Sequence, residues 1–375
     1  MTLTERIKSR ATDLGFDLIG IAPAGRAMRA DAYAQWTEAG RAGEMEYMTR
    51  DPQRRQDVRH FMPEARSVVV VGLSHYTFDL PDEIKRDPSR GLIARYAWGL
   101  DYHDVVTPRL RELLAFIRAE AGREAQARVY VDTGPVLERD FAERAGLGFT
   151  GKNTCLIHPR TGSWLFLGEI IVDLELDYDP PITHIGCGRC TRCLVACPTD
   201  AFVAPYVLDS RRCISYLTIE LKGSIPRELR KPMGNRIFGC DECQDVCPWP
   251  RRFARPTSEK AFYPIDFERA APKLLDVIGL SAEQFRERFR GTPILRAKRK
   301  GLLRNVAIAI GNWGDETAVT GLVNALNDPE PLVRAHVAWA LGQIDIPAAH
   351  NALEARRQIE SDDSVKREIS DSLIR

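Results

Sequence analysis

The chain has 375 residues, of which 44% are hydrophobic, and its formal net charge is +1. This length allows two or three domains with cores of their own, and the nearly neutral balance excludes a partner selected by overall charge alone. The first residues have mixed charge with no apolar run behind them, so no secretory signal is expected. No stretch approaches the roughly 20 apolar residues of a membrane span. We therefore expect a cytoplasmic protein without a membrane partner.

The first 180 residues show helical and strand patterns in alternation. The expected helices span residues 4–14 and 104–121, where apolar residues recur at helical spacing. The expected strands span residues 17–22, 68–74, 128–131 and 164–174. Strands that alternate with helices predict a layered α/β domain over residues 1–180.

Eight of the nine cysteines fall between Cys187 and Cys247. Such crowding in a cytoplasmic protein indicates metal binding rather than disulfides. We expect residues 181–255 to form the domain that carries these cysteines. Cys155 lies outside the crowded segment, and we assign it no role.

The cysteine spacing is that of a bacterial ferredoxin with two [4Fe-4S] clusters. The first run has gaps of two, two and three residues and ends in Cys-Pro, and the second also ends in Cys-Pro, with its first cysteine displaced by an insertion of 26 residues. The last cysteine of such a run ligates the other cluster. The expected ligands are Cys187, Cys190, Cys193 and Cys247 for one cluster, and Cys197, Cys213, Cys240 and Cys243 for the other. Structural zinc is the alternative, because Cys-x2-Cys pairs also suit zinc.

Two clusters form a path for electrons, and such a path needs an end point. The 180 residues before the cysteines are too many for a wrapper alone. We therefore expect a second redox centre or a substrate in the N-terminal domain.

The C-terminal part changes character after a connector over residues 256–290. Amphipathic helices are expected over residues 301–313, 316–327, 331–344 and 347–359. The tripeptide Ala309-Ile310-Gly311 recurs 31 residues later as Ala340-Leu341-Gly342. Helix pairs at this period predict a HEAT-like repeat over residues 291–375, and a plain helical bundle is the alternative.

A basic segment precedes the repeat. Eight basic residues and one acidic residue lie between Arg286 and Arg304. Basic clusters at the edge of a repeat suit a nucleic-acid phosphate backbone, whereas the alternative is a solvated helix face. The candidate contacts are Arg296, Lys298, Arg299 and Lys300, with Lys222 as a weaker one in the cysteine insertion.

Several further motifs surround the cysteines. They are Tyr96–His103, Val131–Gly134, Gly148–Asn153 and Gly162–Glu169 before the first run, and Arg212–Thr218 and Gly234–Arg236 inside the insertion. Together with the cysteine order, they make the chain resemble the epoxyqueuosine reductase family over nearly its whole length, including the C-terminal repeat.

That resemblance implies an α/β cobalamin-binding domain similar to that of reductive dehalogenases, followed by a ferredoxin-like domain with two [4Fe-4S] clusters and the HEAT-like repeat. The implied substrate is epoxyqueuosine at the wobble position of a tRNA, whose epoxide oxygen leaves as water to give queuosine. The implied partners are the tRNA anticodon stem-loop and an external electron donor such as flavodoxin or ferredoxin. We expect the chain to act as a monomer.

The resemblance also implies that Asp132, in the Val-Asp-Thr motif, is the catalytic proton donor. An aspartate at the end of a buried strand, followed by Thr-Gly, occupies a position where α/β enzymes place reactive groups. To donate a proton near neutral pH, it must be kept protonated by desolvation or by a nearby negative group. The alternative is a helix N-cap for the segment that starts at Pro135.

The sequence does not itself reveal a cobalamin site. The signature Asp-x-His-x-x-Gly begins at Asp101-Tyr102-His103, but Val106 replaces the glycine. We therefore expect base-off cobalamin without a histidine ligand, as the resemblance implies. The candidate contacts are Lys152, Asn153, Leu156, Ser163, Leu167 and Ser215, for which ordinary loop or core roles are the alternative.

Three other functions fit parts of the sequence. A corrinoid enzyme that acts on a small molecule, such as a dehalogenase, needs neither the helical repeat nor the basic segment. An electron-transfer protein without chemistry of its own would contain iron and sulfide but no corrinoid. A scaffold whose repeats bind protein would show no salt-dependent tRNA binding.

Overall fold

The computed structural model describes residues 1–374, and these fold into two compact units that are each built from three segments. Unit 1 contains Met1–Thr77, Leu100–Arg211 and Glu242–Phe262. Unit 2 contains Phe78–Gly99, Arg212–Asp241 and the residues from Tyr263 onward. The functional domain boundaries at 180, 255 and 290 stay a prediction.

The centre of unit 1 is a four-stranded sheet in the order β1-β2-β7-β4, with every neighbouring pair antiparallel. Its strands are β1 (Leu18–Pro23), β2 (Ser67–Ser74), β4 (Ala127–Tyr130) and β7 (Leu165–Val172). All four strands expected from the sequence are thus confirmed. The valine run of β2 is buried from Ser67 to Leu73 because this strand lies inside the sheet, between β1 and β7.

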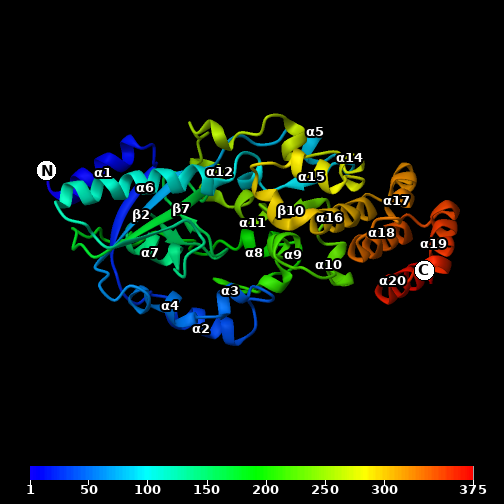
Figure 1. Ribbon diagram of the computed structural model, residues 1–375, viewed down its shortest axis with the longest axis horizontal. Coiled ribbons are helices and arrows are strands. Elements are labelled where there is room, and N and C mark those ends of the chain that lie inside the picture. The colour runs from blue at the N-terminus through cyan, green and yellow to red at the C-terminus, as the bar shows by residue number, and fades with distance from the viewer. Residues whose placement is uncertain (375) are drawn as a thin grey trace. The chain divides into compact units, whose positions relative to one another are not determined.

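Helices cover both faces of this sheet (Figure 1). The helices α1 (Leu3–Asp13) and α6 (Tyr102–Ala121) lie against each other, and α6 contacts β4 and β7. The short helix α7 (Glu138–Arg144) contacts β1, β2 and β7 and contributes Phe141 to the largely aliphatic core of this unit. The layered α/β architecture is therefore confirmed.

Short elements complete unit 1 around the first cysteine run and the Cys-Pro end of the second. The helices are α2 (Ala30–Glu38), α3 (Glu46–Thr49), α4 (Pro52–Gln56), α8 (Arg192–Ala196), α11 (Glu242–Asp245) and α12 (Pro248–Phe253). The two-stranded pairs are β5 (Phe149–Thr150) with β6 (Leu156–Ile157) and β8 (Phe202–Ala204) with β9 (Val207–Leu208).

Unit 2 is mainly helical. Its early elements are α5 (Asp82–Lys85), β3 (Leu92–Ile93), α9 (Ile214–Ile219), α10 (Arg227–Arg230) and β10 (Arg236–Phe238), and β3 pairs with β10 in parallel. The connector holds α13 (Phe267–Ala270), α14 (Leu275–Ile278) and α15 (Ala282–Arg288). The repeat holds α16 (Lys298–Trp313), α17 (Val319–Ala325), α18 (Pro331–Ile344), α19 (Pro347–Ile359) and α20 (Asp363–Leu373).

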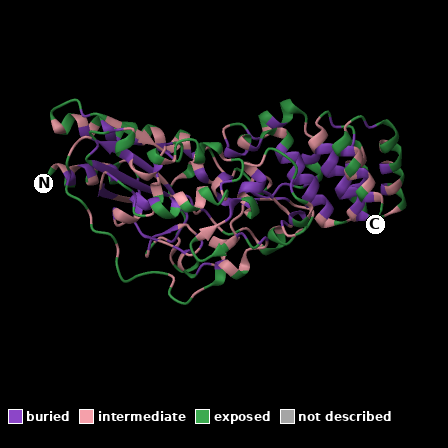
Figure 2. Ribbon diagram, turned by 90° about the horizontal axis from the view of Figure 1, so that it is seen from below, coloured by how far each residue is buried: buried purple, intermediate pink, exposed green. Residues whose placement is uncertain are grey.

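The recurring tripeptide has a packing explanation. A Cβ atom on Gly311 would lie 2.9 Å from the Ala340 Cα atom, and one on Gly342 would lie 2.6 Å from the Ser372 Cβ atom. Gly311 therefore lets α16 approach α18 closely, and Gly342 lets α18 approach α20. The same close approach at both copies is the structural basis of the repeat, and burial is concentrated on these helices (Figure 2).

Among the described residues, no helix is both long and apolar enough to span a membrane.

A buried ion-pair network ties α18 to the segment between α19 and α20. Glu360, only 4% exposed, accepts two hydrogen bonds of 2.8 Å from Arg334 and one of 2.9 Å from Arg356. Burial by itself would raise the pKa of Glu360, but the hydrogen bonds from Arg334, the Asp362 backbone and Arg356 outweigh it and lower that pKa to about 2. The network therefore stabilises the repeat only while Glu360 is ionised.

Replacing Glu360 by Gln should destabilise the repeat by about 3 kcal/mol, because it leaves two arginines without their buried partner. Hydrogen exchange of the α18 amides measures this loss. The stabilisation is complete above the ordinary glutamate pKa of about 4.5 and decreases as the pH falls towards about 2. In Glu360→Gln this acid sensitivity should be reduced.

Glu354→Gln is the matched control, since Glu354 forms only a half-exposed pair with Arg357. Its effect should stay below about 1 kcal/mol. Equal exchange rates in the two variants would contradict a stabilising role for the buried network.

Candidate functional site

Asp132 lies just beyond the end of β4, in a strained turn. Its backbone has a φ of 52°, a left-handed conformation that is uncommon for residues other than glycine. The side chain is 41% exposed, so a substrate can reach it. The helix that follows begins only at Glu138, and its N-cap residue Leu137 makes no side-chain cap. The N-cap alternative for Asp132 is therefore wrong.

Two residues at the start of α6 hold the Asp132 carboxyl group. The Tyr102 hydroxyl donates a hydrogen bond to one carboxyl oxygen, and the His103 Nε2 atom lies 3.1 Å from the other. The second ring nitrogen of His103 lies 2.9 Å from Asp101, which also caps α6. Asp101, His103 and Asp132 thus form a hydrogen-bonded chain of two carboxyl groups and one imidazole.

This chain of groups is suited to proton transfer. An imidazole between two carboxyl groups can pass a proton from one nitrogen while it receives one at the other. The Tyr102 ring is fixed by stacking on Phe166, with a centroid distance of 4.3 Å and an interplanar angle of 13°. The Tyr102 hydroxyl is therefore held at a fixed position beside Asp132, as catalytic geometry requires.

The roles of Tyr102 and His103 are not visible in the sequence. Asp101-Tyr102-His103 matches only the start of a cobalamin signature, whereas the structure shows both His103 nitrogens facing carboxyl oxygens. The available signal was a helix start with a capping aspartate followed directly by two side chains that form hydrogen bonds. Nothing in the sequence showed that this helix start would meet the end of β4.

Unit 1 contains all four cysteines predicted for the first cluster. Cys193 and Cys247 are buried, Cys187 and Cys190 are half-buried, and all have free thiols. The Lys152 backbone N–H donates to the Cys187 sulfur at 3.3 Å, and the Lys152 ammonium group donates to the Gly188 and Cys190 carbonyl oxygens at 2.8 and 2.9 Å. Lys152 therefore holds the loop that carries Cys187 and Cys190 in place.

The cysteines predicted for the second cluster are divided between the units. Cys197 and Cys243 belong to unit 1, and Cys213 and Cys240 belong to unit 2. The Cys197 sulfur accepts the Ala201 backbone N–H at 3.3 Å. Their common ligation stays a prediction.

The residues expected to contact cobalamin have varied surroundings. Asn153 donates to the Cys243 carbonyl oxygen at 3.2 Å, so Asn153, like Lys152, supports a cysteine loop. Leu156 is part of the buried core, and Leu167 is partly buried against it. The Ser163 hydroxyl is buried without a hydrogen-bond partner among the described residues. Ser215 lies on α9, in unit 2.

The basic segment divides into structural and exposed residues. Arg299 pairs with Asp328 and also donates to the Leu280 carbonyl oxygen at 2.6 Å. The fully buried Arg304 donates to the carbonyl oxygens of Leu221 and Gly223, on either side of Lys222, and of Leu217 on α9. The exposed or half-exposed candidates are Lys222, Arg296, Lys298 and Lys300.

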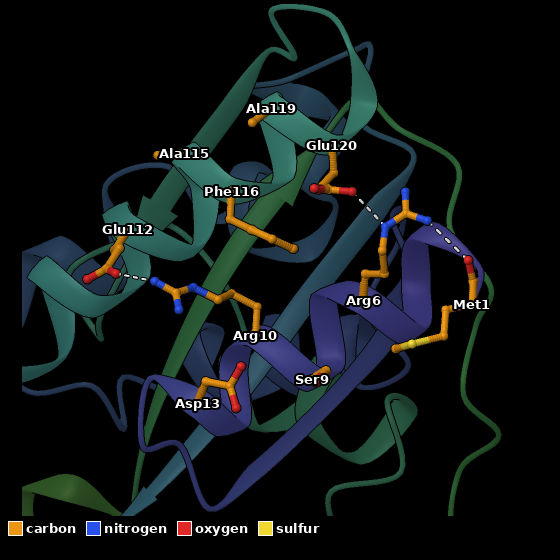
Figure 3. Close-up of a pocket in the computed structure, with 10 residues that line it drawn as sticks. All are labelled: Met1, Arg6, Ser9, Arg10, Asp13, Glu112, Ala115, Phe116, Ala119 and Glu120. Carbon is orange, nitrogen blue, oxygen red and sulfur yellow. Dashed lines mark hydrogen bonds and ion pairs between the residues drawn. The ribbon is translucent and has the colours of Figure 1, made fainter.

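A surface groove of about 650 Å³ lies between α1 and α6. Two ion pairs cross it, Arg6 with Glu120 and Arg10 with Glu112 (Figure 3). The groove contains none of the residues predicted for the clusters, cobalamin or tRNA, so we assign it a structural role in joining the two helices.

Comparisons with known proteins agree with the resemblance over nearly the whole chain. Three family models match: "Epoxyqueuosine reductase QueG" over residues 55–133, "4Fe-4S double cluster binding domain" over residues 186–250, and "HEAT repeats" over residues 292–374. The double-cluster match favours iron–sulfur clusters over zinc. The repeat match favours a HEAT array over a plain bundle.

Individual relatives extend this similarity to full length. The epoxyqueuosine reductase of Pseudomonas aeruginosa is 42% identical over 90% of this chain and 94% of its own. An epoxyqueuosine reductase solved with an epoxyqueuosine-modified tRNA-Tyr stem loop has a TM-score of 0.91 at 34% identity, covering 99% and 98% of the two chains.

The Bacillus subtilis epoxyqueuosine reductase, solved with an aspartate catalytic loop swung out of the active site, has a TM-score of 0.90 at 33% identity and covers 99% and 98% of the two chains. The fold class expected from the sequence is therefore confirmed, and this chain belongs to the epoxyqueuosine reductase family.

Proposed function

We propose that this protein removes the epoxide oxygen of epoxyqueuosine at the wobble position of a tRNA, which gives queuosine and water. The observation that carries this proposal is the relationship to epoxyqueuosine reductases over about nine tenths of the chain at 42% identity. The reaction consumes two electrons and two protons for each oxygen removed. The site must therefore supply both an electron path and a proton donor.

The donor sets in this chain fit the two kinds of cofactor. The eight cysteines at ferredoxin spacing would hold two [4Fe-4S] clusters, which pass one electron at a time. The buried Ser163 hydroxyl without a partner is a group that a bound ligand would satisfy. When bound, cobalamin would supply a low-valent cobalt centre that gives electrons to the epoxide.

Asp132 is the group that we assign to protonate the departing oxygen. The protonated carboxyl group gives its proton to that oxygen as the carbon–oxygen bond breaks, which avoids a free alkoxide. Tyr102 and His103 hold the carboxyl group at a fixed position. The catalytic aspartate loop of the Bacillus subtilis enzyme supports this role, because Asp132 also lies in a loop and is exposed.

The remaining cofactor and partner assignments follow from the same reaction. Both nitrogens of His103 face carboxyl oxygens, which supports cobalamin without a histidine ligand. We assign an external one-electron donor, such as flavodoxin or ferredoxin, to the clusters. We also propose that the chain acts in the cytoplasm as a monomer.

For tRNA binding, we propose that Lys298 and Lys300 contact the phosphate backbone, with Arg296 and Lys222 beside them. Lys298 and Lys300 are exposed at the start of α16, whereas Arg299 between them is used by Asp328. Lys298 and Lys300 therefore stay on the surface, while the ion pair of Arg299 with Asp328 holds the start of α16 in place. The relative that was solved with a tRNA stem loop supports this partner.

Asp132→Asn should lower the rate of queuosine formation on an epoxyqueuosine-modified stem-loop by about a hundred- to ten-thousand-fold, because an amide cannot donate a carboxyl proton. Mass spectrometry of the digested RNA measures the product. Asp104→Asn, on the exposed side of the same helix start, is the matched control and should keep the wild-type rate.

Full activity of Asp132→Asn with clusters and cobalamin intact would remove the acid role. The same assay with the free epoxyqueuosine nucleoside distinguishes the small-molecule alternative. Equal turnover of nucleoside and stem-loop by the wild-type protein would contradict a tRNA enzyme.

Cys187→Ser should lower the iron content after anaerobic reconstitution from about eight to about four atoms per chain, because one cluster loses a ligand. Cys155→Ser should keep about eight, since the predicted ligand sets exclude this residue. Iron analysis together with absorbance and EPR spectra measures both. Zinc in the wild-type protein, or unchanged iron in Cys187→Ser, would contradict the assignment.

Replacing Lys298 and Lys300 by Ala should weaken binding of the stem-loop at low salt. The slope of log affinity against log salt concentration should become shallower by about one for each phosphate that a lysine no longer neutralises. Fluorescence anisotropy titrations at several salt concentrations measure the slope. Lys366→Ala on α20 is the control, and an equal decrease in affinity in all variants would show that these lysines have no specific role.

A further inference from the structure

The proposed reaction needs two protons for each oxygen that leaves as water, and Asp132 carries only one. The second proton must reach the same oxygen after the Asp132 carboxyl group has been used. A source behind Asp132, away from the substrate, would allow this carboxyl group to be reprotonated while the RNA still covers the site. Two further carboxyl groups, those of Glu138 and Glu169, interact electrostatically with Asp132.

Glu169 occupies an unusual position in the middle of the sheet. It lies on β7, where it pairs with Val70 on one side and Tyr130 on the other. Its side chain is fully buried, and neither carboxyl oxygen has a hydrogen-bond partner among the described residues. An ionised carboxylate without partners is costly in such a place, so the burial of Glu169 favours its neutral form.

The pleat of β7 directs Glu169 toward α7. Side chains two residues apart share a face of a strand, and Leu167 and Ile171 both belong to the core that includes Phe141 of α7. Tyr130, which is opposite Glu169 in the register, belongs to the same core. Glu169 therefore lies on the sheet face that α7 covers.

Glu138 is the first residue of α7, and it interacts electrostatically with both Asp132 and Glu169. The Asp132 backbone also forms a hydrogen bond with the Glu138 carboxyl group. The residue is only partly buried by surface area, yet its carboxyl group is enclosed by protein.

Burial and the ionised form of Asp132 raise the pKa of Glu138 to about 7, and Arg139 and Arg55 oppose this rise. Burial, together with Glu138 and Asp132, raises the pKa of Glu169 well above the ordinary value. No other charged group among the described residues is found to act on Glu169. Near neutral pH, a carboxyl proton is therefore available on this face of the sheet.

We propose that Glu138 and Glu169 form a proton reserve that recharges Asp132 during the proposed reaction, on which this inference rests. As the epoxide carbon–oxygen bond breaks, the oxygen takes the Asp132 proton. Glu138 then transfers its proton to the Asp132 carboxylate, and Glu169 replaces the proton on Glu138. The recharged Asp132 protonates the same oxygen again, so that it leaves as water, while an external one-electron donor supplies the two electrons.

The test compares Glu138→Gln, Glu169→Gln and the control Glu175→Gln in the full-length holoenzyme. Glutamine keeps the shape but carries no acidic proton, and Glu175 is an exposed residue after β7. Single-turnover product formation by Glu138→Gln and Glu169→Gln should be slower by at least about tenfold. The wild-type rate should fall as the pH rises through about 7, and this fall should disappear in Glu138→Gln. Glu138→Asp, which keeps an acid, should recover part of the rate.

Infrared difference spectra of the same proteins give a readout that does not depend on turnover. Between about pH 5 and about pH 9, the carbonyl band of a protonated carboxyl group should titrate in the wild type and be lost in Glu138→Gln. Glu169→Gln should remove a second band that persists to higher pH. If Glu169→Gln does not fold, Glu138→Gln alone carries the test, because its residue lies at the edge of the core.

Wild-type rate and pH profile in Glu138→Gln would overturn the proposal, as would carboxyl bands that are absent from the wild type. If the wild-type protein shows no activity on epoxyqueuosine RNA, the proposed function fails instead. In that case the infrared titration still decides whether two buried acids are present.

Discussion

The antiparallel pairing of β4 with β7 is the constraint on which the candidate site depends. Its register places Tyr130 opposite Glu169, and the chain then turns at Asp132 toward the start of α6. A slip of one residue would move Glu169 to the other face of the sheet, away from α7. The same register thus fixes both the end of β4, where Asp132 follows, and the buried Glu169 on the neighbouring strand.

Polar residues near the cysteines support the loops that carry them. Lys152 and Asn153, which the sequence suggested as cofactor contacts, bind the loops that carry Cys187, Cys190 and Cys243. A cluster site therefore depends on residues far from the cysteines in the chain. Their roles toward cobalamin stay predictions, and loop support is the role that their hydrogen bonds show.

Basic residues near the repeat differ in function although they are adjacent in sequence. Arg299 and Arg304 satisfy a buried carboxylate and several carbonyl oxygens, so the fold already uses their charge or donors. Lys298 and Lys300 remain on the surface. A count of charges along the chain cannot separate these roles, because successive side chains on a helix point in directions about 100° apart around its axis.

The sequence by itself determined the strands around the valine run of β2 and the repeat, because local spacing and periodicity encode both. The cysteine ligand sets and the role of Asp132 stay predictions from the cysteine spacing and the motif resemblance. Only the tertiary structure decided that Asp132 is no helix cap, that Tyr102 and His103 hold it, and that Glu169 is buried on the strand that pairs with β4. These contacts join residues about 30 or more positions apart or across neighbouring strands, and no local pattern records which strand will pair with which. Strand order and register, rather than composition, bring the acid and its partners together.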